Sequence, residues 1–495
     1  MKDSRICNAK DFLSALIEKG ILVDPKTFEA IKQLFETKKD IASLVANSIC
    51  DGECKEISSA IIYQKIKFFQ ARNEKITIKK TAKKTRKDYD AQLTVRKNSE
   101  QRGKKDISLF RDYFVSRYDK IKKILMNHLD LNNLVSISNL SFSIRRNTDI
   151  SIIAIVKEII EAKTGTILLD VEDKTGFVRV FVKEPDLCKN VITDEVIGIS
   201  GSYFSGGIIA KKIVFPEIPI PDGINKIDEP LKAVFISDIH LGSKEYIKSI
   251  EEKFLKWINK DKQTEDVKYL FIAGDNVDGV GIYPSQKDDL EIENIYDQYS
   301  EFEKLIEKIP EEIEIAICPG NHDAVTQFEP QDALDEIYVP NLMNYSNVHL
   351  VKNPEYIYLH NNDDADGMKV LMYHGYSFTS IIDVIPELRK RGLSNPEYIM
   401  KEVLRKRHLA PLYGSSLINP LKEDLLVIDE IPDIFQTGDL HSHCLKNYKG
   451  ITLISSSTFQ GQTSFMDRVG HIANPGKASI VDLNTRDIFI KNFMQ

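Results

Sequence analysis

The chain has 495 residues, of which 42% are hydrophobic and 28% charged, and its formal net charge is −7. At roughly 150 residues per domain this length predicts about three domains, and the composition excludes collagen, a long coiled coil and global disorder. The charge is segregated, because residues 72–105 contain 13 Lys or Arg against four acids, a net of +9 that leaves −16 for the remainder.

No apolar run reaches the 18 or more residues that a membrane-spanning helix needs, and no apolar signal segment follows Met1. We therefore expect an intracellular, cytoplasmic protein without a membrane partner. Six cysteines are scattered along the chain, and only Cys50 and Cys54 lie close together, without a second pair downstream. Reduced thiols are expected here in place of a zinc site.

The first 147 residues divide into three predicted segments. Residues 1–71 carry apolar side chains at helical spacing, which predicts a small helical domain. Residues 72–105 have too few core-forming side chains to fold alone, so we expect a flexible basic linker that is a tether, an arm contacting DNA phosphates, or both. An apolar stripe from Leu109 to Leu125 predicts a helical lead-in over residues 106–147.

Short strands dominate the pattern of residues 148–218. Turns at Lys163-Thr164-Gly165 and Lys174-Thr175-Gly176 separate runs of β-branched residues. About five strands in so short a stretch predict a closed barrel of the OB type. Such barrels often bind single-stranded nucleic acid on aromatic side chains. Aromatic residues are few in this stretch, however, so docking of another protein is at least as strong an expectation.

Residues 229–495 follow a proline-spaced boundary at 215–223 and alternate apolar runs with helical segments. The carboxyl ends of such strands are where open α/β sheets collect ligand-binding residues. Each of five apolar runs is followed by acidic, imidazole or amide side chains. Five such motifs are too many to be explained as structural turns. The five motifs are Asp238-Ile239-His240, Gly274-Asp275-Asn276-Val277-Asp278, Gly320-Asn321-His322-Asp323, His374-Gly375 and Gly438-Asp439-Leu440-His441-Ser442-His443.

The donor types in these motifs indicate a class of metal. Asp, His and Asn without Cys suit a pair of divalent ions, with Mn²⁺ preferred over Mg²⁺, Fe or Zn²⁺, because one carboxylate can bridge two ions about 3.5–4 Å apart. Such a pair activates a water and holds the oxygens of a phosphoryl group. The sequence therefore predicts phosphoester hydrolysis.

The motifs resemble those of the calcineurin-like metallophosphoesterase superfamily, which implies an α/β/β/α sandwich and a multidomain α+β protein overall. Carried over residue by residue, the resemblance implies that Asp238 and His240 bind the first metal ion and that Asp275 bridges both ions. It implies that Asn321 and His374 bind the second ion.

The same resemblance assigns the acid–base chemistry. His322 is similar to the superfamily's histidine that is not a ligand but contacts the phosphate and protonates the leaving oxygen. Asp278 would orient His322, forming a dyad whose carboxylate favours the imidazolium form.

The fifth motif departs from the superfamily's Gly-His-x-His pattern. Alignment on Gly438 places Asp439 on the second metal and His441 on the first, and leaves His443 peripheral. Alignment on the His-x-His pair uses His441 and His443 instead and requires two additional residues after the strand. We favour the first alignment because strand ends fix geometry better than loops do. Aspartate in place of histidine would favour Mn²⁺ or Mg²⁺.

A barrel directly before a phosphoesterase domain resembles the small subunits of replicative DNA polymerases, in particular those of archaeal family-D polymerase, over about residues 106–495. The resemblance implies a heterodimer with a large catalytic subunit and a nucleoid-associated location. It also implies a 3′→5′ exonuclease that proofreads single-stranded or mismatched 3′ ends, and contact with the sliding clamp through an unidentified segment. One rival is a stand-alone repair nuclease, whose phosphoesterase domain usually comes first. The other is a non-catalytic scaffold, which the irregular fifth motif would suit.

Two basic stretches lie between the fourth and fifth motifs and resemble the corresponding segment of that family. We expect them to contact DNA phosphates beside the site without reading the base sequence. Solvated helix faces are the alternative. The residues concerned are Arg389, Arg391, Arg405, Lys406, Arg407 and His408.

Overall fold

The computed structural model describes residues 9, 31–32, 91–96, 107–140, 149–360 and 367–495. The chain forms two compact units, one of residues 1–85 with 335–346 and one of residues 86–334 with 347–495. The predicted helical domain of residues 1–71 lies almost entirely outside the described residues. The second unit contains the barrel and all five strand-end motifs.

Five strands form a closed barrel in the order β2-β3-β4-β6-β5, as predicted. Neighbouring strands are antiparallel except β4 and β6, which run parallel. On β4 the valines 178, 180 and 182 point into the barrel and are buried, whereas the alternate residues Phe177 and Arg179 are exposed. The strands are β2 (Asp149–Glu161), β3 (Ile167–Asp173), β4 (Gly176–Val182), β5 (Val196–Phe204) and β6 (Gly207–Val214).

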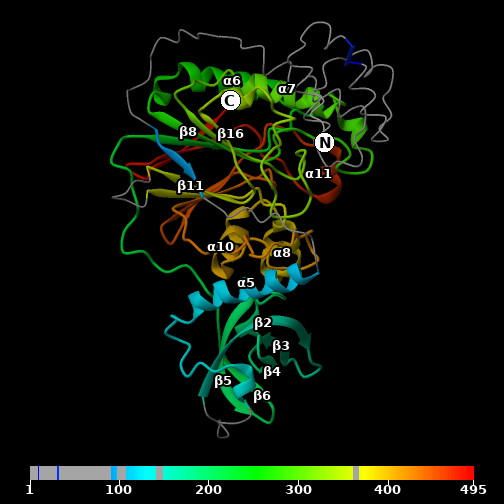
Figure 1. The fold of residues 1–495 in the computed structure, drawn as a ribbon, viewed down its shortest axis with the longest axis vertical. Coiled ribbons are helices and arrows are strands. Elements are labelled where there is room, and N and C mark those ends of the chain that lie inside the picture. Colours follow the sequence, from blue (N-terminus) through cyan, green and yellow to red (C-terminus); the bar gives the residue numbers. More distant parts are fainter. Residues whose placement is uncertain (1–8, 10–30, 33–90, 97–106, 141–148, 361–366) are drawn as a thin grey trace, which may run out of the picture. The chain divides into compact units, whose positions relative to one another are not determined.

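The helix α5 (Ser108–Leu125) lies ahead of the barrel strands in the sequence (Figure 1). Its apolar stripe packs Tyr118, Ile121 and Leu125 against barrel residues and against Val427 of the C-terminal part. Arg117 on the same helix is fully buried and donates hydrogen bonds to Asp424 at 2.8 Å, to the Pro411 carbonyl at 2.7 Å and to the Asp194 carbonyl at 2.9 Å. The helix therefore joins the barrel to the C-terminal part through a buried charge pair.

The C-terminal part contains two six-stranded sheets. The first has the order β1 (Leu93–Val95), β11 (Glu355–Leu359), β12 (Met368–Met372), β13 (Ile434–Thr437), β15 (Ile451–Ser455) and β14 (Cys444–Tyr448). The second has the order β10 (Val348–Leu350), β9 (Glu314–Cys318), β8 (Val267–Ala273), β7 (Lys232–Ile236), β16 (Lys477–Asp482) and β17 (Ile488–Asn492).

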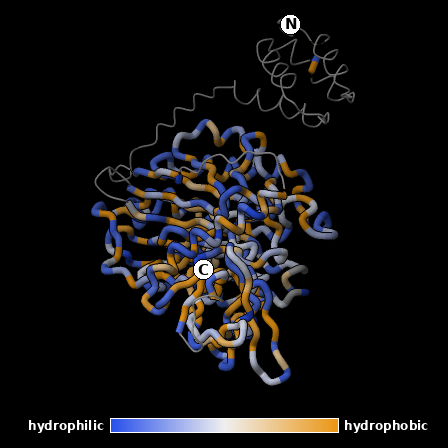
Figure 2. Tube along the Cα trace, turned by 60° about the horizontal axis from the view of Figure 1, so that its bottom comes forward, coloured by the Kyte–Doolittle hydropathy of each residue, from blue (hydrophilic) through white to orange (hydrophobic). Residues whose placement is uncertain are grey.

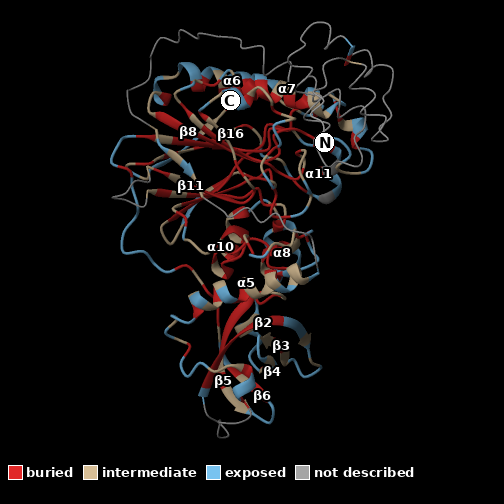
Figure 3. Cartoon of the chain, in the orientation of Figure 1, coloured by how far each residue is buried: buried red, intermediate tan, exposed pale blue. Residues whose placement is uncertain are grey.

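One apolar core joins the two sheets, in which Phe235 and Phe271 of the second sheet meet Val370 and Ile434 of the first. All seven residues of β8 are buried, because helices α6 (Lys248–Lys260) and α7 (Ile295–Ile306) cover the outer face of the second sheet (Figure 1, Figure 3). The outer face of the first sheet packs against α8 (Phe378–Val384), α9 (Pro386–Arg391) and α10 (Pro396–Lys406). A short helix, α11 (Ser464–Val469), follows β15. The protein is thus a mixed α and β protein of several domains.

Hydrophobic and hydrophilic residues interleave along the trace (Figure 2). Within the described ranges, no helix combines the length and the apolar character that crossing a membrane requires.

Part of the predicted flexible linker is in fact a strand. β1 pairs antiparallel with β11, with Leu93 opposite Leu359, and its side chains pack on the core between the sheets. The guanidinium of Arg96 donates to both carboxylate oxygens of Asp429 at 2.9 and 3.0 Å. The linker prediction is therefore wrong for residues 91–96, because an apolar pattern of three residues does not stand out from the charges around it.

Candidate metal centre

The five strand-end motifs meet at one place in the second unit. Asp238 and His240 follow β7, Asp275 follows β8, His374 follows β12 and His441 follows β13. Their ligand atoms form overlapping trios in which all atoms lie within 4.8 Å of one another. The trios are Asp238 with His240 and His441, His240 with Asp275 and His322, and Asp238 with Asp275 and His374.

The backbone after β7, β8 and β13 adopts left-handed conformations at the residues that carry these side chains. Asp238, His240, Asp275, Asp439 and His441 all have positive φ, between 45° and 61°. This left-handed region is uncommon for residues other than glycine, although Asp and His tolerate it better than branched residues do. Such conformations concentrate at functional sites, where the surrounding structure holds them.

Two groups of possible metal-binding residues flank Asp275, the first around His240 and the second around His374. Its Oδ2 lies 3.6 Å from Nε2 of His240 and 3.3 Å from Nε2 of His374. On the first side, Nε2 of His441 is 3.0 Å from Nε2 of His240 and 3.3 Å from Oδ1 of Asp238.

On the second side, Nε2 of His374 lies 3.0 Å from Oδ1 of Asn321 and 3.9 Å from Oδ1 of Asp439. The structure therefore gathers Asp238, His240 and His441 into one group, Asn321, His374 and Asp439 into another, and places Asp275 between them.

Hydrogen bonds on the far side of each ring fix the direction of the imidazoles. Nδ1 of His374 donates to the Ala273 carbonyl at 2.8 Å, and Nδ1 of His240 donates to the Asp278 carboxylate at 3.0 Å. In both rings the other nitrogen, Nε2, faces the cluster, and once it is unprotonated its lone pair can bind a cation. Outer hydrogen bonds of this kind are the usual support for metal-binding histidines.

These residues are of the kinds that bind metal ions. Nε2 of His240 faces Nε2 of His441, and Nδ1 of His441 is buried without a hydrogen-bond partner. A buried polar atom without a partner is costly. Cations that accept the ring lone pairs would stabilise this arrangement, and oxygen and imidazole donors without thiolate suit Mn²⁺-type ions.

A positive charge would also stabilise the buried carboxylates of the cluster. Burial raises the pKa of Asp238 and of Asp439 to about 6 each. Burial acts on Asp275 in the same sense, but the imidazoles of His374 and His322 outweigh it and hold the pKa of Asp275 well below its usual range. Burial lowers the pKa of His441 to about 3, which keeps that ring neutral and able to bind a metal.

His322 lies beside the cluster and is held by the backbone. Its Nδ1 donates to the Asp278 carbonyl at 2.7 Å, and its amide donates to Oδ1 of Asp275 at 2.9 Å. Burial opposes a charge on this ring, but the carboxylates of Asp275 and Asp278 outweigh burial and raise the pKa of His322.

The predicted pairing of Asp278 with His322 needs correction. The carboxylate of Asp278 binds His240, and only its backbone carbonyl binds His322. The spacing of three residues after Asp275 identified Asp278 as part of the site but could not show which of its oxygens faces which ring.

Sequence reasoning missed Asp323, a buried residue that holds the loop of the third motif. It accepts hydrogen bonds from the amide of Gly320 at 2.8 Å, from Nδ2 of Asn276 at 3.0 Å and from the hydroxyl of Tyr299 at 2.9 Å. Burial raises the pKa of Asp323 to about 6. Gly320 must be glycine, because a Cβ there would lie 2.2 Å from Oδ1 of Asp275.

In the fifth motif, Asp439 and His441 are the residues at the cluster. His443 lies elsewhere, with Nε2 at 2.9 Å from the hydroxyl of Ser479 on β16. This placement agrees with the alignment on Gly438.

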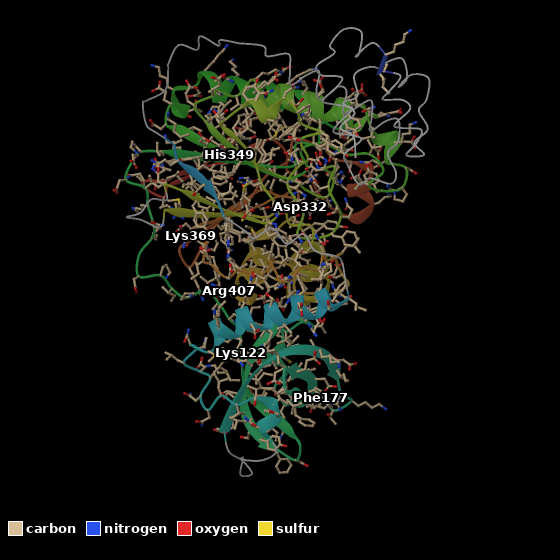
Figure 4. All side chains as sticks on the ribbon, viewed as in Figure 1. Lys122, Phe177, Asp332, His349, Lys369 and Arg407 are labelled. Atoms are coloured by element: carbon tan, nitrogen blue, oxygen red, sulfur yellow. The ribbon has the colours of Figure 1, made fainter. Side chains whose placement is uncertain are left out.

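Three of the six residues predicted to contact DNA are buried and bound within the protein, so that prediction is wrong for them. Lys406 binds Glu195 of the barrel at 2.7 Å, and His408 binds Asp424 at 2.8 Å. Arg407, labelled in Figure 4, donates from Nε to the Ile428 carbonyl at 2.7 Å. Glu195 stands more than 200 positions from its partner, so the local run of charge could not reveal the pairing.

The other three residues of these stretches reach solvent to different degrees. Arg389 and Arg391 are exposed at the end of α9, where Arg391 lies 3.8 Å over the ring of Tyr398. Arg405 is half-buried and lies 3.8 Å over the ring of Phe215.

The comparisons with known proteins agree on one family. A family model described as the B subunit of DNA polymerase alpha/epsilon matches residues 233–446. The DNA polymerase II small subunit of Archaeoglobus fulgidus is 37% identical over 378 residues, 74% of each chain. That of Methanothermobacter thermautotrophicus is 36% identical over 388 residues, 75% of this chain and 76% of the relative. That of Thermoplasma acidophilum is 34% identical over 423 residues, 83% of this chain and 82% of the relative.

Among solved structures, an archaeal phosphodiesterase aligns with 53% of this chain and 99% of its own at 13% identity, with a TM-score of 0.26 that is too low to support an inference. The long sequence matches to whole relatives are the deciding observation. This chain belongs to the family of archaeal DNA polymerase II small subunits.

Proposed function

We propose that this small subunit carries a metal-dependent 3′→5′ exonuclease that hydrolyses DNA phosphodiesters at unpaired 3′ ends. It would act beside a large catalytic subunit that contains the polymerase site. The observation that carries the proposal is the position of Asp275 between two groups of metal donors. We assign the two sheets and their helices to the calcineurin-like phosphoesterase sandwich and the barrel to the OB type.

The donor set provides for two divalent ions, with Mn²⁺ preferred. The first ion would be held by Asp238, His240 and His441, the second by Asn321, His374 and Asp439, and both by Asp275. Bound there, the ions would polarise the phosphoryl oxygens and lower the pKa of a water.

His322 would supply the proton for the departing group. Nδ1 of His322 donates to the Asp278 carbonyl, so Nε2 is the nitrogen left to face the substrate and to carry the proton for the leaving oxygen. A water releases one proton to solvent and its oxygen attacks phosphorus, the bond from phosphorus to the 3′-oxygen of the penultimate nucleotide breaks, and Nε2 of His322 donates its proton to that oxygen. The terminal nucleotide leaves as a 5′-monophosphate. Proton transfer by a positioned side chain contributes roughly 10²- to 10⁴-fold to the rate.

The test is degradation of single-stranded DNA labelled at its 3′ end by the full chain with Mn²⁺. Asn321→Ala and His322→Ala should both lower the rate, the latter by roughly 10²-fold or more. His349→Ala is the matched control, because His349 binds Glu314 on the neighbouring strand β9 and is not one of the gathered donors (Figure 4).

Equal activity in wild type and both site variants would refute the assignment of the site. No activity in any of them, even with the large subunit present, would favour a non-catalytic scaffold.

A further inference from the structure

Among the residues gathered at the metal centre, His322 and Asp439 are partly exposed to solvent. The other three imidazoles of the cluster, His240, His374 and His441, are buried, with exposed fractions of 5% or less. His322 is only half-buried. A DNA end that places its phosphate at this centre can therefore approach it beside His322.

An aromatic ring stands beside His322 at this approach. The rings of Tyr283 and His322 have centroids 6.3 Å apart and an interplanar angle of 61°. Tyr283 is half-buried, and its hydroxyl donates to Oδ2 of Asp289 at 3.1 Å. The hydrogen bond thus holds the side chain in place, while part of the ring still reaches solvent.

The loop that carries Tyr283 is anchored to the same atom as His322. The buried amide of Gln286 donates to the Asp278 carbonyl at 2.7 Å and accepts from the amide of Ile282 at 2.9 Å. That carbonyl also accepts from Nδ1 of His322, likewise at 2.7 Å. One backbone oxygen therefore binds both the imidazole of His322 and the side chain that supports the loop carrying Tyr283.

Both ends of this loop are also fastened. At its start, Gly279 exchanges hydrogen bonds with the side chain of Gln298 at 2.9 and 3.1 Å. At its end, the Asp289 carbonyl accepts from the amide of Lys244 at 3.0 Å. An aromatic side chain held in advance loses little conformational freedom when it contacts a ligand.

We propose that Tyr283 is a specificity-determining residue that stacks on the base of the 3′-terminal nucleotide while its phosphate lies at His322. This inference rests on the proposed exonuclease function. A base and its phosphate are joined through a single sugar, so a ring beside the phosphate-binding imidazole is within reach of the base. A paired base already stacks on its neighbours, and leaving that stack has a cost that an unpaired base avoids. Tyr283 would therefore select 3′ ends whose terminal base is unpaired.

The experiment uses the full chain with Mn²⁺ and three substrates. These are a single strand with an ordinary 3′-terminal nucleotide, the same strand with an abasic 3′-terminal nucleotide, and bis(p-nitrophenyl) phosphate, which has no base. Tyr283→Leu removes the aromatic ring, and Tyr283→Phe keeps the ring and removes only the hydrogen bond to Asp289. Tyr358→Leu is the matched control, because Tyr358 is also half-buried and its hydroxyl also donates to a carboxylate, that of Glu430 at 3.0 Å.

Tyr283→Leu should raise KM on the ordinary strand roughly 5- to 100-fold, the range expected for the loss of one base–aromatic stack. Its kcat should stay near that of wild type, and the variant should match wild type on the abasic strand and on the small ester. Tyr358→Leu should behave like wild type on all three substrates, and Tyr283→Phe, which keeps the ring, should raise KM on the ordinary strand far less than Tyr283→Leu does.

The outcomes separate this inference from the proposed function. Equal losses on the ordinary and abasic strands would show that Tyr283 only supports the loop and would overturn the stacking role. An active wild type with an unaltered Tyr283→Leu would overturn the stacking role and leave the exonuclease standing. A wild type that hydrolyses none of the substrates, with or without the large subunit, would overturn both.

Discussion

The carboxylate of Asp278 lies 3.0 Å from Nδ1 of His240, while the backbone carbonyl of the same residue accepts a hydrogen bond from Nδ1 of His322 at 2.7 Å. One residue thus orients two imidazoles through two different oxygens. Because a side-chain substitution changes only one of these oxygens, the two contacts can be separated by experiment.

Asp278→Asn should weaken metal binding while leaving His322 in place. The amide has the shape of the carboxylate but not its charge, and it can no longer hold His240 as strongly. Changes to outer partners of metal-binding histidines typically lower affinity 10- to 100-fold. Isothermal titration with Mn²⁺ should show a loss of about that size, and kcat at saturating Mn²⁺ should recover. A kcat that stays low at saturating Mn²⁺ would assign the carboxylate to His322 after all.

In the fifth motif, we expect His441 to bind metal and His443 not to bind it. His441→Ala removes a donor beside Asp238 and His240, and Asp439→Ala removes one beside His374, so each variant should bind one Mn²⁺ fewer or markedly more weakly. His443→Ala should keep the wild-type stoichiometry, because His443 binds Ser479 on β16. Titration of the three variants in parallel measures this, and loss of an ion in His443→Ala would restore the alternative alignment.

Arg117→Met should be strongly destabilising. Arg117 and Asp424 are both fully buried, and removing one partner of a buried pair leaves an uncompensated charge at a cost of about 3–5 kcal/mol. Arg111→Met is the matched control on the same helix, because the side chain of Arg111 is 75% exposed and its pair with Asp112 should contribute less than about 1 kcal/mol. Urea unfolding measures both free energies, and similar losses would contradict the structural role of Arg117.

Stability should fall as pH drops through the range below neutrality, partly because of His408. Burial and the nearby guanidinium of Arg117 lower the pKa of His408 from 6.5 to about 4. Its Nε2 donates to Asp424 and its Nδ1 accepts from the amide of Ala410, so the neutral ring uses both nitrogens.

The sign of this effect depends on where the proton binds. Below about pH 6.5 the unfolded chain binds a proton on His408 that the folded chain takes up only near pH 4, so stability is lost as pH falls between these values, by roughly 3 kcal/mol in all. The free energy of unfolding between about pH 7 and pH 4.5 should therefore depend less on pH in His408→Gln. An unchanged slope in that variant would show that His408 is not the group responsible.

The convergence of the donors was predictable from the sequence. Each motif follows a buried apolar strand, and β7, β8 and β9 run parallel to one another, as do β12 and β13, so their carboxyl ends share an edge. The closed barrel was predictable for a different reason, because glycine turns separate a series of strands within a short stretch of the chain.

Pairings between distant segments were not predictable. Lys406 and Arg407 belong to a basic run that is typical of a solvated or DNA-contacting face, yet Lys406 pairs with Glu195 and Arg407 donates hydrogen bonds to backbone carbonyls. Such burial depends on which segments the fold brings together. The partner of the Asp278 carboxylate was hidden for the same reason, since His240 precedes it by 38 positions.

The strand β1 determines where the C-terminal part of this protein can be cut. Its residues pair with β11, and the amide of Gln92 donates to the hydroxyl of Tyr269 at 2.9 Å. A fragment that starts at α5 would lack β1 and would present the unpaired amides and carbonyls of β11 to other molecules. Uncovered strands of this kind invite edge-to-edge aggregation. A recombinant fragment meant to stay monomeric should therefore begin before residue 91.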